Sequence, residues 1–125
     1  MLVWSKGTFG TVLKDAFKAG RDNNGNIVYV GKAVHFVNDY QSEQLPATVI
    51  ASHKFAHASY GEEELDIDNY EVLCGYAFYW KLVIPHMPIP DGAVSTGKTV
   101  SDEDLFVVRV AHDKSDVIGK VLKKA

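Results

Sequence analysis

The chain has 125 residues, of which 46% are hydrophobic, and its 13 Lys and Arg stand against 16 Asp and Glu, for a formal net charge of −3. This length and hydrophobic content suit one folded domain that buries about two-thirds of its unfolded surface, and they exclude a disordered chain. The acidic balance offers no basic face for a polyphosphate, so nucleic acid is not an expected partner.

The first elements along the chain are predicted to be extended. Residues 12–19 are the one helix candidate, but Gly10 and Gly20 bracket only a couple of turns, which is marginal for a helix in water, and we favour an extended conformation. Residues 26–36 follow a turn and are rich in β-branched and aromatic side chains, which predicts a strand. Residues 52–60 also have an extended pattern.

The later elements follow the same trend. Residues 69–74 alternate, with Tyr70 and Val72 on one face and Leu73 on the other, as in a half-buried strand. The apolar run 76–84 falls short of the ~20 residues of a membrane helix and predicts one long buried strand or two short ones. Residues 105–111 predict a further strand. The chain is therefore expected to be all-β.

The chain also repeats itself. Eight residues recur 77 positions later with the same chemical type. The first set is Ala16, Gly20, Arg21, Val28, Tyr29, Val30, Lys32 and His35, and its counterparts are Ala93, Gly97, Lys98, Leu105, Phe106, Val107, Arg109 and His112. Trp4 and Asp15 match Trp80 and Asp91 at an offset of 76, and residues 45–49 match 117–121 at an offset of 72.

Two copies of one β unit predict a pseudo-symmetric sheet structure in which the copies pack together. We expect a single domain over residues 1–125, with repeat one at about 4–79 and an incomplete repeat two at about 80–125. Repeat two has no counterpart of residues 52–73. Either the chain is truncated, or the last strands are missing and a partner must cover the exposed edge.

The repeated residues resemble the DM-nine repeat family, which occurs in tandem in invertebrate proteins. The residues that carry the resemblance are Trp4, Asp15, Ala16, Gly20, Arg21, Asp22, residues 29–33, Tyr60, Gly61, residues 70–73 and residues 89–93. The resemblance implies a pseudo-twofold β-sandwich built from two intertwined DM-nine repeats. It also implies metal-independent, lectin-like recognition of mannose in innate immunity, and in some relatives relocation to vesicles or membranes.

The family's sugar contacts centre on an Asp in a Gly-x-Asp turn and a Lys in a Pro-Gly-Lys turn. The resemblance places the Asp at Asp22 in repeat one, where Thr48 stands in the Lys position. In repeat two Thr99 stands in the Asp position, and Lys120 is retained. Each copy therefore keeps half of the pair, and these four residues are the candidate carbohydrate-binding positions.

This pair of residue types suits a sugar because a carboxylate accepts two vicinal hydroxyl groups and an ammonium group donates to their oxygens. Loss of the Lys at Thr48 costs about 1–3 kcal/mol, or roughly tenfold to hundredfold in affinity. One alternative pairs Asp22 with Lys120 across the interface between the copies. Another gives Asp22 an ordinary turn role, with its side chain bonded to the backbone two residues on, and makes Lys120 part of a solvated basic tail.

No metal, cofactor or enzyme activity is expected. His53 and His57 are four apart, which suits zinc on a helix, but the segment is extended and no Cys or carboxylate stands at ligand spacing. The acidic run over residues 62–68 lacks the spacing of a calcium loop and is interpreted as a solvated loop. No nucleophile, base and orienting group combine into a catalytic set.

The expected partner is mannose or a mannose-containing glycan, and a homodimer is expected because weak single sites gain avidity from several copies. The single cysteine, Cys74, and the absence of a signal-peptide core indicate a cytoplasmic protein. The resemblance adds vesicle or peripheral membrane association, or release without a signal peptide. The alternative function is a protein-interaction or scaffold module whose sugar site has decayed, as Thr48 and Thr99 indicate.

Overall fold

The computed structural model describes residues 3–7, 14–84 and 86–124. Every regular element in this part of the chain is a strand, so the all-β prediction is confirmed. No helix in these ranges has the length and hydropathy to cross a membrane. The strands are β1 (Val3–Lys6), β2 (Lys18–Arg21), β3 (Ile27–Phe36), β4 (Ser42–Val49), β5 (Ala56–Tyr60), β6 (Glu63–Ile67), β7 (Tyr70–Cys74), β8 (Ser95–Lys98), β9 (Glu103–His112) and β10 (Ser115–Lys124).

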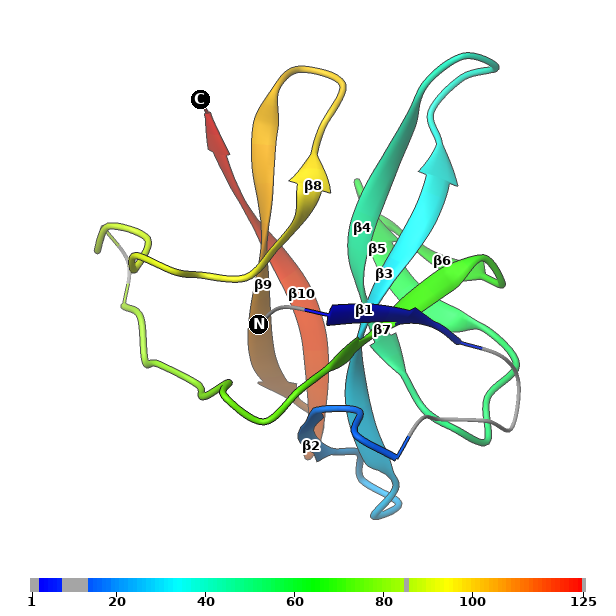
Figure 1. The fold of residues 1–125 in the computed structure, drawn as a ribbon, viewed down its shortest axis with the longest axis vertical. Helices are drawn as coiled ribbons and strands as arrows, with labels where there is room; N and C mark the ends of the chain where they lie inside the picture. Colours follow the sequence, from blue (N-terminus) through cyan, green and yellow to red (C-terminus); the bar gives the residue numbers. More distant parts are fainter. Residues whose placement is uncertain (1–2, 8–13, 85, 125) are drawn as a thin grey trace.

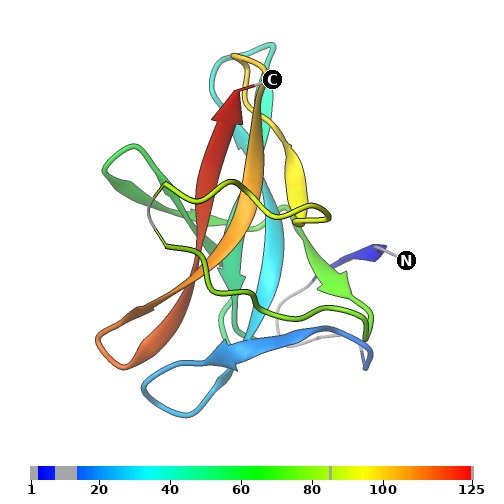
Figure 2. The same cartoon turned by 90° about the vertical axis from the view of Figure 1, so that its left-hand side faces the viewer.

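The strands form two antiparallel sheets (Figure 1). The larger sheet has the order β1-β7-β3-β4-β5-β6, with β2 paired to β3, and the smaller has the order β10-β9-β8. Figures 1 and 2 show the long β9–β10 hairpin beside the β3–β4 hairpin, and β10 contacts both β4 and β2. The smaller sheet therefore closes over one side of the larger one.

The predicted strands at residues 26–36, 69–74 and 105–111 are confirmed as β3, β7 and β9, and the extended pattern at 52–60 is confirmed in β5. The alternation in β7 has the predicted consequence, since Tyr70 and Val72 enter one hydrophobic cluster and Leu73 enters the other. Ala16 makes a β-bridge and β2 begins at Lys18, so the extended conformation is confirmed from residue 16 onward, while residues 14 and 15 form a turn. Residues 12 and 13 lie outside the described residues.

The prediction of a buried strand over residues 76–84 is wrong. The segment has no regular structure, and Tyr76 and Tyr79 are 86% and 82% exposed. Trp4, the counterpart of Trp80, pairs with Leu73 of β7, but none of the described strands forms a backbone pairing with residues 76–84. A strand without a hydrogen-bonding neighbour gains nothing from its β propensity. Trp80 is instead held by its side chain, whose Nε1 donates to the Ala19 carbonyl at 3.0 Å.

The interpretation of residues 62–68 as a solvated loop is also wrong. Residues 63 to 67 form β6, which pairs with β5 over its whole length. The turn between the two strands includes Gly61, whose positive φ of 62° suits glycine. The acidic side chains of β6 are exposed to solvent, although the backbone forms a strand at the edge of the sheet.

The pairing registers repeat at the offsets found in the sequence. Each copy has a hairpin with a register irregularity near its start, followed by a second hairpin to the next strand. The matched pairs are Lys18↔Tyr29 with Ser95↔Phe106, Gly20↔Val28 with Gly97↔Leu105, and Val30↔Thr48 with Val107↔Lys120. The two β units therefore match in their backbone pairing. The division of the chain into two DM-nine repeats and the pseudo-twofold sandwich stay predictions.

The buried side chains form two clusters on opposite faces of β3 and β4. One is built mainly from the larger sheet and includes Leu45, Val49 and Val72, which are 0%, 1% and 2% exposed, together with Leu105 from β9 of the smaller sheet. The other lies toward the smaller sheet and includes Val28 and Ile118. Because β10 contributes Ile118 to this second cluster, the two sheets share a core.

Candidate functional site

A pocket of about 490 Å³ opens where the two copies meet. Its walls are the turn after β2, strands β4, β5 and β6, and the β9–β10 hairpin. Most of the residues that line it are polar and offer both hydrogen-bond donors and acceptors, while apolar atoms make up the larger part of its exposed surface. The side chains that matter below are Asp22, His53, His57, Glu64, Ser115 and Asp116.

Asp22 stands in the turn between β2 and β3 and is mostly occupied there. Its Oδ1 accepts the backbone N–H groups of Asn24 at 2.9 Å and Asn26 at 2.8 Å, and its Oδ2 accepts the Asn26 side-chain amide at 3.1 Å. The side-chain hydrogen bond from Asn26 lowers the pKa of Asp22 from its usual value. About one of four acceptor directions remains, so this carboxylate has room for one sugar hydroxyl rather than two.

The β9–β10 hairpin supplies two groups that the sequence did not indicate. The Asp116 Oδ2 accepts a hydrogen bond from the Arg21 backbone N–H at 2.9 Å. The Ser115 hydroxyl accepts a hydrogen bond from the Asn23 backbone N–H at 2.8 Å. Asp116 makes this one hydrogen bond among the described residues, so it keeps more acceptor capacity than Asp22. It is therefore the better-placed carboxylate for a polyol.

The docking of this hairpin has a counterpart in the other copy. The Glu43 Oε2 accepts the Val100 backbone N–H at 3.0 Å, and these residues match Ser115 and Asn23 at the repeat offsets. Glu43 is only 4% exposed, and this bond gives its buried carboxylate a partner. The sequence carried no direct signal for these contacts, because it does not show that Glu43 is buried.

Thr48, in the family's Lys position, has a structural role. It is 8% exposed, and its Oγ1 accepts the Ile118 backbone N–H at 2.9 Å. The bond joins β4 of the larger sheet to β10 of the smaller one. Thr48 thus lies at the wall of the Asp22 pocket without projecting a positive charge into it.

Thr99 and Lys120 are not among the residues that line this pocket. The Thr99 hydroxyl accepts the backbone N–H groups of Ser101 at 3.2 Å and Glu103 at 3.1 Å, which matches the turn bonding of Asp22. The Lys120 ammonium lies 5.1 Å from the centre of the Tyr60 ring, a cation–π contact that a solvated tail does not make. The structure therefore brings together Asp22 and Thr48, and it does not bring Lys120 to Asp22.

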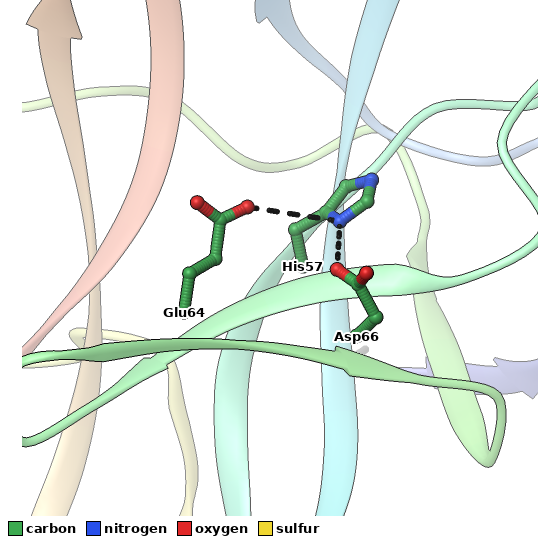
Figure 3. A group of neighbouring side chains, drawn as sticks. All are labelled: His57, Glu64 and Asp66. Atoms are coloured by element: carbon green, nitrogen blue, oxygen red, sulfur yellow. Dashed lines mark hydrogen bonds and ion pairs between the residues drawn. The ribbon is translucent and has the colours of Figure 1, made fainter.

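A histidine–carboxylate cluster forms another part of the wall. His57 Nδ1 lies 2.7 Å from Asp66 Oδ1 and 3.8 Å from Glu64 Oε1, and Figure 3 shows both carboxylates directed at this nitrogen. The expectation that no carboxylate stands at ligand spacing from the histidines is wrong. His57 is directly opposite Asp66 in the β5–β6 pairing, so the spacing arises across strands.

The fold and the pocket define a class of protein: an all-β domain of two sheets with a pocket between them. The DM9 repeat model matches residues 36–125, more than half of the chain. The chain belongs to the DM9 (DM-nine) repeat family, as the resemblance in its sequence implied. The match crosses the expected boundary between the copies at residue 80. No curated protein was found to match the chain.

Proposed function

We propose that the protein is a non-enzymatic, lectin-like carbohydrate-binding protein that takes mannose-type sugars in the pocket between its copies, without a metal or another cofactor. The observation that carries the proposal is the meeting of Asp22 and Asp116, one from each copy, in one polar pocket. Two carboxylates with neighbouring hydroxyl and amide groups suit the alternating donors and acceptors of a polyol. Membership of the DM9 repeat family supports the same conclusion.

This site differs from the Asp–Lys pair that the resemblance implied. Asp116 contributes the acceptor capacity that Asp22 spends on its turn, and no ammonium group among the described side chains forms an ion pair with either carboxylate. Binding of a single sugar is therefore weak, and two sites in a homodimer raise the avidity for a branched glycan. We assign such a protein to pattern recognition in innate immunity, in the cytoplasm, at vesicles, or outside after release without a signal peptide.

Calorimetric titration with mannose in the presence of EDTA, beside retention on immobilised mannan, tests the proposal. We expect saturable binding, at least tenfold weaker for Asp116→Asn and Asp22→Asn. Asp91→Asn is the matched control, since it makes the same change in charge at an exposed residue outside the pocket. Binding that both pocket variants leave unchanged would contradict this site.

A protein-interaction or scaffold role is the second candidate, and two observations favour it. Thr48 and Thr99 both spend their hydroxyl groups on the backbone. In addition, Val110, Val117 and Val121 of the smaller sheet are 52%, 37% and 36% exposed. Wild-type protein that neither binds mannose nor is retained on mannan would favour this role over the first.

A further inference from the structure

The β5–β6 hairpin gathers one imidazole and two carboxylates on one side of the sheet. His57 of β5 stands directly opposite Asp66 of β6. Glu64 and Asp66 are two residues apart on a strand, so their side chains point to the same side, and Figure 3 shows both beside His57. The pairing of β5 and β6 continues through Tyr60↔Glu63, so the hairpin fixes this arrangement in the backbone.

The distances in this cluster suit a small divalent cation. One ligand atom from each of the three residues lies within 4.8 Å of the others. Bonds of about 2.0–2.2 Å to nitrogen and oxygen in a tetrahedral zinc site place ligand atoms about 3.4 Å apart. The separations from His57 Nδ1, 2.7 Å to Asp66 and 3.8 Å to Glu64, lie on either side of that value. Small rotations of the carboxylates are enough to reach it.

The burial of the three side chains also fits such a site. The His57 side chain is 26% exposed, and those of Glu64 and Asp66 are 73% and 58% exposed. The imidazole is thus held by its surroundings while the carboxylates are free to adjust. Solvent has access from the carboxylate side, so a fourth coordination position there is open to water.

His53 occupies the position of an orienting partner. Its Nδ1 lies 2.9 Å from His57 Nε2, the nitrogen that faces away from the carboxylates. A histidine that binds a metal through Nδ1 carries its hydrogen on Nε2, and such ligands usually donate that hydrogen to a fixed acceptor. His53 provides this acceptor, and its ring meets that of His57 edge-on at 79° with the centres 5.1 Å apart.

We propose that His57, Glu64 and Asp66 bind a divalent transition-metal cation of the zinc class, with His53 as a positioning residue. The ligand set favours zinc over calcium and magnesium, because an imidazole nitrogen suits the former and the latter prefer oxygen ligands. The site lies on the wall of the candidate sugar pocket, which His57 and Glu64 also line. It is separate from the carbohydrate proposal, in which no metal takes part.

The first test is calorimetric titration of the tag-free chain with zinc chloride in the absence of sugar. We expect one zinc per chain, and at least tenfold weaker binding for His57→Gln and for Asp66→Asn. Glu63→Gln is the matched control, because it removes the same charge from the adjacent residue of β6, whose side chain points to the other side. This control is expected to bind zinc like the wild type.

Cobalt(II) absorption separates the ligands from the positioning residue. His53→Gln is expected to weaken binding about tenfold, in line with the loss of an outer partner, and to keep the wild-type cobalt spectrum. His57→Gln is expected to lose that spectrum because it removes a ligand.

The proposal is overturned if the wild type binds no zinc at millimolar concentration, if His57→Gln binds as tightly as the wild type, or if calcium competes equally. It is also overturned if Glu63→Gln loses as much affinity as Asp66→Asn. Since no sugar is present in these titrations, each of these results leaves the carbohydrate proposal standing.

Discussion

The two β units have the same strand pairing, but their matched side chains are buried to different extents. Strands β2–β3–β4 and β8–β9–β10 share their registers and their turn bonding. Yet Leu45 and Val49 are 0% and 1% exposed, whereas their counterparts Val117 and Val121 are 37% and 36% exposed. In the first copy, β5 and β7 extend the sheet on both sides and contribute to the core. Register is therefore encoded within each hairpin, while burial depends on strands elsewhere in the chain.

The largest expected difference between the two β units is in the unfolding free energy lost when one matched valine in each is truncated to alanine. Val49→Ala is expected to cost roughly 2–3 kcal/mol of unfolding free energy, since it removes two buried methyl groups and leaves a cavity. Val121→Ala is expected to cost less than about 1 kcal/mol, because water already reaches the side chain. Urea denaturation at low protein concentration measures both.

Equal losses in these two valine variants would contradict the contrast and show that the second face is covered in solution. A loss in Val121→Ala that appears only at high protein concentration would identify that cover as a second copy of the chain.

A smaller difference is expected between two cation–π pairs that occupy matched positions. The Lys32 ammonium lies 5.0 Å from the Trp4 ring centre, and the Arg109 guanidinium lies 4.9 Å from that of Trp80. Arg109 also donates to the Ala19 carbonyl at 2.7 Å. We expect Arg109→Ala to cost about 1–2 kcal/mol and Lys32→Ala about 0.5–1 kcal/mol. Thermal unfolding of both variants measures these losses. A larger loss in Lys32→Ala than in Arg109→Ala would show that the hydrogen bond from Arg109 to Ala19 adds nothing.

The sequence predicted those elements whose signal is local. Strand β3 is dense in β-branched and aromatic residues, and its neighbours in space only reinforce that preference. Residues 76–84 have a similar composition, but no described strand pairs with them, so the same local signal failed. The prediction of a loop over the acidic residues 62–68 was wrong in the opposite direction. Their charge indicated a loop, but pairing with β5 makes a strand of residues 63–67.

The same limit applies to the candidate site. Asp22 was found because its turn carries a motif within a few residues. Asp116 was not, because its contact with Arg21 joins positions 95 residues apart in the chain. The approach of Asp66 to His57 required knowledge of a hairpin register, which spacing along the chain does not give. Contacts of this kind depend on tertiary packing, which local patterns do not specify.

The smallest expected difference lies in the two matched turns, and it depends on pH. Asp22 and Thr99 accept equivalent backbone N–H groups, but only Asp22 is ionisable. Its pKa in the folded chain is lowered from 3.8, chiefly by the Asn26 side chain.

A lowered pKa means that the charged form of Asp22 stabilises the fold at pH values above the pKa of the unfolded chain. This contribution is lost as the pH falls through the pKa of the folded chain. Thermal midpoints of the wild type and Asp22→Thr should therefore differ most near neutral pH, begin to converge as the pH falls below 3.8, and meet below the lowered pKa of Asp22. Thr99→Asp, which gives the second turn the residue of the first, should acquire the same pH dependence. A gap between wild type and Asp22→Thr that stays constant across the acid range would show that the charge of Asp22 adds nothing to its turn.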